Sequence, residues 1–180
     1  MLGEMQHGHL DQVGYDTYCK LLDEAVKEEK GIEVSDELDV LIDINVSSFI
    51  PDTYIENTTQ KIEIYQSIAL CRTDEEINNI ILDIEDRFGK MPNEVLNLIE
   101  IARIKKDCMQ NGIYKVMQKQ DNVVFYFKQE LFIFDVADLI KKYEDRIRFS
   151  TGFVPYLTLK LEDKNNVIKE IEEFLNVNNK

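Results

Sequence analysis

The sequence predicts an α+β fold, with helices dominating the first half and short strands flanked by helices in the second. Three observations lead to this class. Apolar residues recur at helical spacing through residues 57–111, short β-prone runs follow Gly112, and one helix is apolar on two sides. We therefore expect a central two-sided apolar helix, surrounding helices and a small, mainly antiparallel sheet. A separate amphipathic N-terminal helix should precede this arrangement.

The N-terminal part, residues 1–31, is expected to be distinct from residues 32–180. Residues 1–9 read as the end of a preceding segment, and a helical pattern then runs from Asp11 until Gly31 closes it. His7 and His9 lack further ligands at a fixed spacing, so exposed loop residues explain them better than a metal site. The apolar side of the helix comprises Leu10, Val13, Gly14, Tyr18, Leu21, Leu22, Ala25 and Val26.

A strand is predicted from Leu38 to Val46, because every second residue is apolar and only a strand has a period of two. A helix from about Asn57 to Cys71 follows the irregular connection around Pro51. Its expected inner stripe consists of Ile62, Tyr65, Ile68 and Ala69.

Two helices joined by a tight corner form the centre of the predicted fold. Thr73 and Glu76 match a capping box, which begins a helix that should end at Gly89. Pro92 restarts the chain, and the two-sided helix is expected from Asn93 to Asn111. The stripe of the first helix is Ile77, Ile80, Ile81, Ile84 and Phe88; the second carries Val95, Leu98, Ile99, Ala102 and Met109 on one side and Ile101, Ile104 and Cys108 on the other.

Short strands are expected after Gly112, with a turn at Gln120-Asp121. The predicted strands cover residues 113–117, 122–127, 131–134, 146–149 and 154–161, and a short helix covers 136–143. Pro155 favours a strand start or an edge strand. Asp163 or Asn165 should cap a final helix whose apolar residues are Val167, Ile168, Ile171, Phe174 and Leu175.

One face of the helix at residues 73–88 is the candidate binding site. The 100° advance per residue places five residues together opposite the apolar stripe, and we call this set the acidic face: Glu75, Asn79, Leu82, Asp83 and Asp86. It has two explanations. It is either a docking surface for a basic patch with Leu82 as apolar anchor, or a solvated helix face with an incidental leucine.

Composition excludes several functions. The net charge of −14 disfavours direct binding to nucleic acid or to an anionic membrane, and no apolar run is long enough to span a bilayer. Nucleotide-binding and hydrolase motifs are missing, so we expect no enzyme activity and no cofactor or metal in this chain. Cys19, Cys71 and Cys108 are expected to be buried, reduced thiols of a cytoplasmic protein. A hydrolase using a carboxylate pair stays the least supported alternative.

Several ordered motifs resemble the C-terminal part of the bacterial transcription-repair coupling factors (Mfd). Residues 2–26, with Leu2-Gly3-Glu4-x-Gln6-x-Gly8-His9 and Val13-Gly14-Tyr15-Asp16, resemble the end of the family's RecG-like translocation motif and a connecting helix. Three further motifs resemble the C-terminal regulatory domain of the family and occur in the same order as there: Ile50-Pro51-Asp52-x-Tyr54-Ile55, Asp86-Arg87-Phe88-Gly89-x-x-Pro92 and Ile101-Ala102-Arg103.

The resemblance implies a non-catalytic, autoinhibitory domain of a DNA translocase active in transcription-coupled repair. Gln6 matches the translocation motif, while ATP, Mg²⁺, helicase-like motifs and DNA binding would belong to the parent protein. In the family, this domain docks on the UvrB-like N-terminal domain and masks recruitment of UvrA, and Asp83 and Asp86 match acidic positions of that contact. UvrA and RNA polymerase would be indirect partners. The alternative is an independent acidic adaptor that binds a basic partner in trans, and a dimer through the N-terminal helix is a further possibility.

Overall fold

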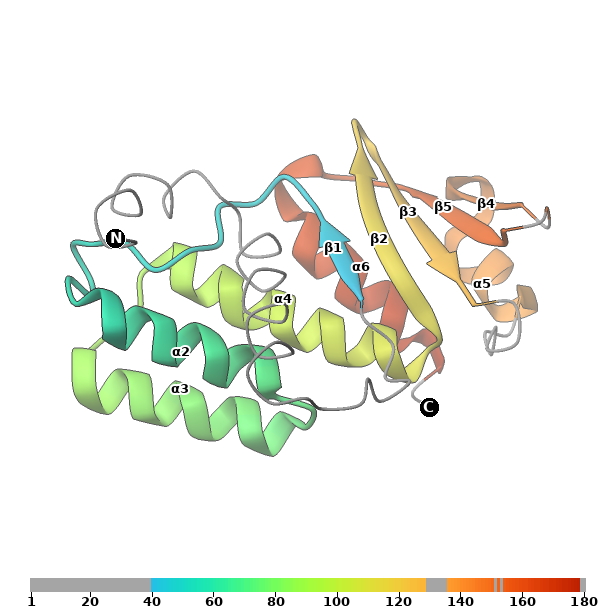
Figure 1. The fold of residues 1–180 in the computed structure, drawn as a ribbon. Coiled ribbons are helices and arrows are strands. Elements are labelled where there is room, and N and C mark those ends of the chain that lie inside the picture. The colour runs from blue at the N-terminus through green and yellow to red at the C-terminus, as the bar shows by residue number, and fades with distance from the viewer. Residues whose placement is uncertain (1–39, 129–135, 151, 153, 179–180) are drawn as a thin grey trace, which may run out of the picture. The chain divides into compact units, whose positions relative to one another are not determined.

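The computed structural model describes residues 40–128, 136–150, 152 and 154–178, and their elements confirm the α+β class (Figure 1). These residues form two compact units. One contains Val46–Arg103, and the other contains residues 40–45 and 104–178. The domain boundary between residues 31 and 32 stays a prediction. Other predictions that lie outside the described residues concern Gln6, His7, His9, Cys19, the helix closed by Gly31 and the strand at 131–134.

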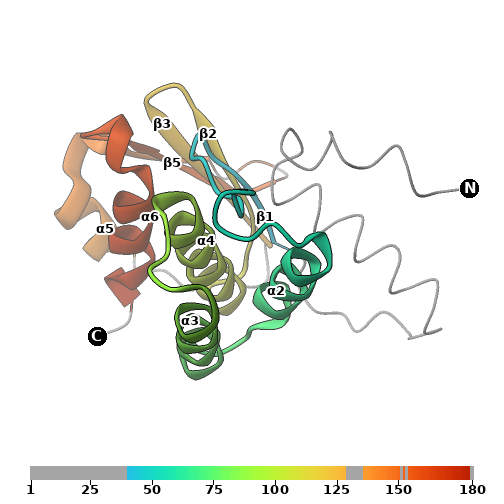
Figure 2. The same ribbon diagram turned by 90° about the vertical axis from the view of Figure 1, so that its left-hand side faces the viewer.

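The first unit contains α2 (Thr58–Leu70), α3 (Asp74–Phe88) and the first part of α4 (Asn93–Gln110). Helices α2 and α3 lie beside each other, joined by a short connection (Figures 1 and 2). The predicted capping box is confirmed. Glu76 N–H donates to Thr73 Oγ1 at 3.2 Å, and Thr73 N–H donates to Glu76 Oε2 at 3.0 Å. Gly89 ends α3 with a φ of 79°, which glycine adopts without strain.

The inner face of α2 differs from the prediction. Tyr65 and Ile68 are buried as expected, but Ile62 and Ala69 are only half-buried, and Lys61 and Ile64 are buried instead. The reason is an ion pair. The Lys61 ammonium binds the Asp52 carboxylate in the turn before the helix, so the aliphatic stem of the lysine can lie inside.

Helix α4 is buried on two sides, as its sequence predicts. Its buried apolar residues are Val95, Leu98, Ile99, Ile101, Ala102, Ile104 and Cys108. The stripe of α3 is less enclosed, because Ile77 and Ile84 are buried whereas Ile80, Ile81 and Phe88 are half-buried.

In the described part of the second unit, five strands form a sheet with the order β1-β2-β3-β5-β4. The strands are β1 (Leu41–Asp43), β2 (Ile113–Lys119), β3 (Asn122–Phe127), β4 (Ile147–Ser150) and β5 (Tyr156–Lys160). Strand β1 is parallel to β2, and the other neighbours are antiparallel. This agrees with the mainly antiparallel sheet that the sequence predicts.

Strand β1 is shorter than the predicted strand at 38–46, although its alternation is right, since Val40 and Ile42 are buried and Leu41 is exposed. Among the strands that the structure describes, it lies at the edge of the sheet and pairs with β2 alone. Beyond Asp43 the ladder is replaced by a side-chain contact, in which Asn45 N–H donates to Gln118 Oε1 at 2.9 Å. The length of β1 is therefore set by its hydrogen-bonded pairing with β2 and not by the alternation of apolar residues in its sequence.

Helices α5 (Val136–Tyr143) and α6 (Val167–Leu175) lie against one face of the sheet (Figure 2). The Phe174 ring stacks on Phe125 of β3 with centroids 4.3 Å apart, and Tyr143 lies 6.0 Å from Phe174. Asp163 caps the 3-10 turn before α6 by accepting from Asn165 N–H at 2.9 Å. Pro155 precedes the start of β5, which is an inner strand.

Candidate docking surface

The acidic face occupies the exposed side of α3, and all five of its residues are exposed. Leu82 is the most telling of them, because 65% of its surface is accessible in the middle of a fifteen-residue helix. The carboxylates at positions 75, 83 and 86 share the acidic face with it. An exposed leucine on the same helix face as three carboxylates has the composition of a contact in which an apolar anchor is combined with polar groups.

Arg87 modifies this charge pattern. Its guanidinium forms an ion pair with Asp83 at 3.0 Å and lies 4.9 Å from the centre of the Phe88 ring. The Asp83 side chain stays 59% exposed, so the pair leaves one side of the carboxylate available. Asp83 and Arg87 are four residues apart, a spacing at which opposite charges pair on a helix. The prediction of the acidic face from the sequence did not include this pair.

Glu75 and Asp86 have a different environment. Among the residues that the structure describes, neither carboxylate has a cation or a hydrogen-bond donor assigned to it. Residues 46–103 contain 11 acidic and five basic residues, so the surroundings are negative as well. These two carboxylates are therefore the strongest sites on the acidic face for an incoming cation.

The start of α3 is fixed from its other side by Arg103 of α4. The guanidinium contacts Asp74 at 3.2 Å and Asn78 at 2.8 Å, and it also lies 3.7 Å from Glu100. Neither Asp74 nor Asn78 belongs to the acidic face, although Asn78 lies one turn before Leu82. The contacts consequently hold α3 without using any residue of that face.

The end of α3 is fixed by the loop that precedes α2. Tyr54 Oη donates to the carbonyl oxygen of Gly89 at 2.7 Å, and its ring lies 6.2 Å from that of Phe88. The same loop is held by Tyr65, whose hydroxyl accepts from Ile50 N–H at 2.8 Å. Two motifs that are distant in sequence, at residues 50–55 and 86–92, thus meet beside the acidic face.

The described cysteines are buried free thiols, as predicted for Cys71 and Cys108. Burial raises the pKa of both, and the Asp107 carboxylate raises that of Cys108 further. Across the described ranges, no group of three or more His, Cys, Asp or Glu side chains could hold a metal ion. Every helix there is too short or too polar to cross a bilayer.

Comparison with known proteins identifies the fold. The structure resembles the crystal structure of a C-terminal domain of transcription-repair coupling factor with a TM-score of 0.67 and 21% identity, covering 82% of this chain and 94% of that one. The molecule is thus an α+β domain of that structural type.

The sequence comparisons go further. The TRCF domain matches residues 44–134, and the chain belongs to this family. It is 38% identical over 121 residues to the transcription-repair-coupling factor of Staphylococcus aureus strain USA300, and 37% identical over 121 residues to that of Staphylococcus haemolyticus. In each case the match covers 66% of this chain and 10% of the relative, so the chain spans about a tenth of these proteins.

Proposed function

We propose that this chain is the regulatory C-terminal domain of a transcription-repair coupling DNA translocase. In this proposal, the acidic face docks on a basic surface of the UvrB-like domain of the same protein and masks the surface that recruits UvrA. The chain itself is not catalytic. ATP and Mg²⁺ bind to other parts of the parent protein, and contact with RNA polymerase is indirect.

The observation that carries the proposal is the exposed acidic face, which lies within the residues that match the family. Leu82 provides an apolar anchor, while Glu75 and Asp86 provide charges without an assigned partner in the described chain. An intramolecular contact of this kind need not be strong. Linked partners meet at about millimolar effective concentration, so a weak docking surface stays occupied until a competing ligand displaces it.

The experiment reverses two charges in the intact parent protein. Asp83→Lys with Asp86→Lys replaces attraction by repulsion at two positions, and close charge pairs across interfaces carry about 1–3 kcal/mol of coupling each. The domain should be released. UvrA binding and DNA-stimulated ATP turnover should both rise, whereas the isolated chain should keep its fold because both residues are exposed.

A matched control is Glu63→Lys, which makes the same charge reversal on an exposed residue of α2. It should leave both activities unchanged. Wild-type UvrA binding and ATP turnover in the double variant would refute docking through this face. If the isolated chain captured a separate basic protein and did not bind the UvrB-like domain, the adaptor acting in trans would replace the proposal.

A further inference from the structure

A second candidate surface lies on the sheet of the second unit. Helices α5 and α6 cover one face, and the strand register places the outward side chains in three rows across the other, which we call the open sheet face. The first row is Leu41, Lys115, Tyr126, Tyr156 and Ser150; the second is Asp43, Met117, Val124, Thr158 and Arg148; the third is Lys119, Asn122 and Lys160. This face borders an open hollow of about 890 Å³.

Three tyrosines form a strip, of which Tyr126 and Tyr156 belong to the first row and Tyr114 lies beside Tyr126. The ring of Tyr126 lies 6.3 Å from that of Tyr114 and 5.8 Å from that of Tyr156. Lys115 Nζ lies 5.5 Å from the centre of the Tyr126 ring, and Tyr156 is 39% exposed. Of the three rings, those of Tyr126 and Tyr156 line the hollow, and they offer stacking surfaces to planar groups that are not themselves paired.

Basic side chains accompany the tyrosines. Lys119, Arg148 and Lys160 are exposed, and each lines the hollow. Among the described residues none of the three has an ion pair assigned to it. One exposed carboxylate, that of Asp145, also lines the hollow. The three cations outnumber it and are placed to contact successive anionic groups along a bound chain.

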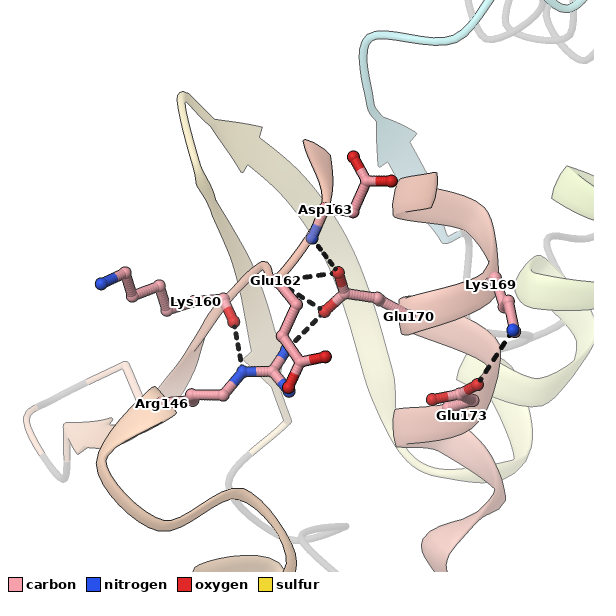
Figure 3. Close-up of polar contacts among 7 residues, drawn as sticks. All are labelled: Arg146, Lys160, Glu162, Asp163, Lys169, Glu170 and Glu173. Atoms are coloured by element: carbon pink, nitrogen blue, oxygen red, sulfur yellow. Dashed lines mark hydrogen bonds and ion pairs between the residues drawn. The ribbon is translucent and has the colours of Figure 1, made fainter. Parts of the chain in front are cut away.

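Arg146 also borders the hollow, but its charge is already balanced. Its guanidinium binds Glu162 at 2.6 Å and also pairs with Glu170, while Nε donates to the carbonyl oxygen of Lys160 at 3.0 Å (Figure 3). Glu170 is held in turn by the backbone N–H groups of Glu162 and Asp163. This network fixes the end of β5, and the Lys160 side chain extends away from it (Figure 3).

The net charge of the chain hides this local pattern. Residues 40–45 and 104–180, which include all strands of the sheet, contain 13 basic and 13 acidic residues, so the excess of acid lies elsewhere in the chain. The net charge of −14 disfavours binding of nucleic acid by the chain as a whole. It is an average over all residues and does not describe the open sheet face. At about 0.15 M salt, charges more than about 8 Å away are largely screened.

We propose that the open sheet face binds single-stranded nucleic acid, with bases stacked on Tyr126 and Tyr156 and phosphates held by Lys119, Arg148 and Lys160. A single strand fits better than a duplex, because its bases are free to stack on aromatic rings. An acidic peptide would use the lysines but would leave the tyrosine strip without planar partners. The inference is independent of the acidic face, which lies in the other unit.

The test measures binding of the full chain to a fluorescein-labelled oligothymidylate of about 12 nucleotides, a length within the range that single-strand binding folds cover. Anisotropy titrations at low and moderate salt should show saturable binding that weakens as salt increases. The slope of log K against log salt should fall by about 0.7 for each phosphate contact that a variant removes. Duplex DNA of the same length and an acidic peptide should bind more weakly.

Two variants separate charge from stacking. Lys119→Glu with Lys160→Glu alters exposed residues only and should weaken binding by at least about tenfold and reduce the salt slope. Tyr126→Phe should keep the affinity, because the ring remains, whereas Tyr156→Ser should weaken binding at every salt concentration with an unchanged slope. The control Lys141→Glu changes an exposed lysine on α5, which covers the opposite face, and should bind as the wild type does.

Three results would overturn the proposal: no binding of the oligothymidylate at low salt, equal binding by the double lysine variant, or binding of the acidic peptide in preference to the oligonucleotide. The last result would assign the face to a protein partner.

Discussion

The hydroxyl of Tyr54 donates a 2.7 Å hydrogen bond to the carbonyl oxygen of Gly89 and joins the loop before α2 to the end of α3. Gly89 has a φ of 79°, so its carbonyl is turned out of the helical direction. Burial raises the pKa of Tyr54, and the Glu85 carboxylate raises it further. The bond fixes the end of the helix that carries Asp86.

Tyr54→Phe should lower the free energy of unfolding by about 1 kcal/mol, the usual net contribution of a hydrogen bond. Tyr54→Ala should lower it further, because the contact with the Phe88 ring is lost as well. Urea unfolding followed by circular dichroism measures both. An unchanged midpoint for Tyr54→Phe would mean that water replaces the bond at no cost.

Thr73→Ala removes the side-chain acceptor of the capping box at the start of α3 and should cost about 1 kcal/mol. Thr59→Ala, in the first turn of α2, is the control, since Thr59 is exposed and does not cap its helix. Equal urea midpoints for the two variants would show that the box does not stabilise α3.

The capping box of Thr73 and Glu76 also makes the stability of the protein depend on pH in the acid range. The backbone N–H groups of Arg72 and Thr73 hold the pKa of Glu76 below its ordinary value of 4.5. A lowered pKa in the folded state contributes stability above pH 4.5, and this stability is lost as the pH falls through the folded value. Melting temperatures of Glu76→Gln and wild type should differ at neutral pH and converge in acid. A difference that is constant with pH would contradict this.

The buried side chain of Tyr143 should make the stability of the protein depend on alkaline pH. Burial, with Glu173 next, raises its pKa from 10.0 to about 12, and no described residue accepts a hydrogen bond from its hydroxyl. Because the pKa of Tyr143 is raised in the folded state, its neutral form contributes stability that is complete below pH 10, and this contribution is lost as the pH rises toward 12. Tyr143→Phe should unfold like the wild type at neutral pH and should be the more stable of the two at alkaline pH. Parallel pH curves would contradict the shift.

The sequence predicts those features that are determined over short distances along the chain. Thr73 and Glu76 lie three residues apart, and Gly89 ends its helix by its own backbone freedom, so both could be assigned by inspection. The acidic face follows from helical geometry for the same reason. Its exposure needed the structure, whereas the i to i+4 spacing of Asp83 and Arg87 already pointed to their ion pair.

Features that depend on distant contacts were missed. Lys61 lies inside because Asp52 meets it from the preceding turn, and β1 ends early because Asn45 bonds to Gln118. The open sheet face is the largest such case. Tyr126 and Tyr156 are 30 positions apart, and only the pairing of β3 with β5 brings their rings together.

The central claim is that the acidic face docks on the UvrB-like domain, and titration calorimetry of the isolated chain against that domain tests it most directly. The proposal predicts binding that weakens with salt, and at least about tenfold weaker binding for Asp86→Lys, a loss of about 1.4 kcal/mol. Glu63→Lys should bind as the wild type does. Absence of binding, or equal affinity for Asp86→Lys and wild type, would contradict the claim.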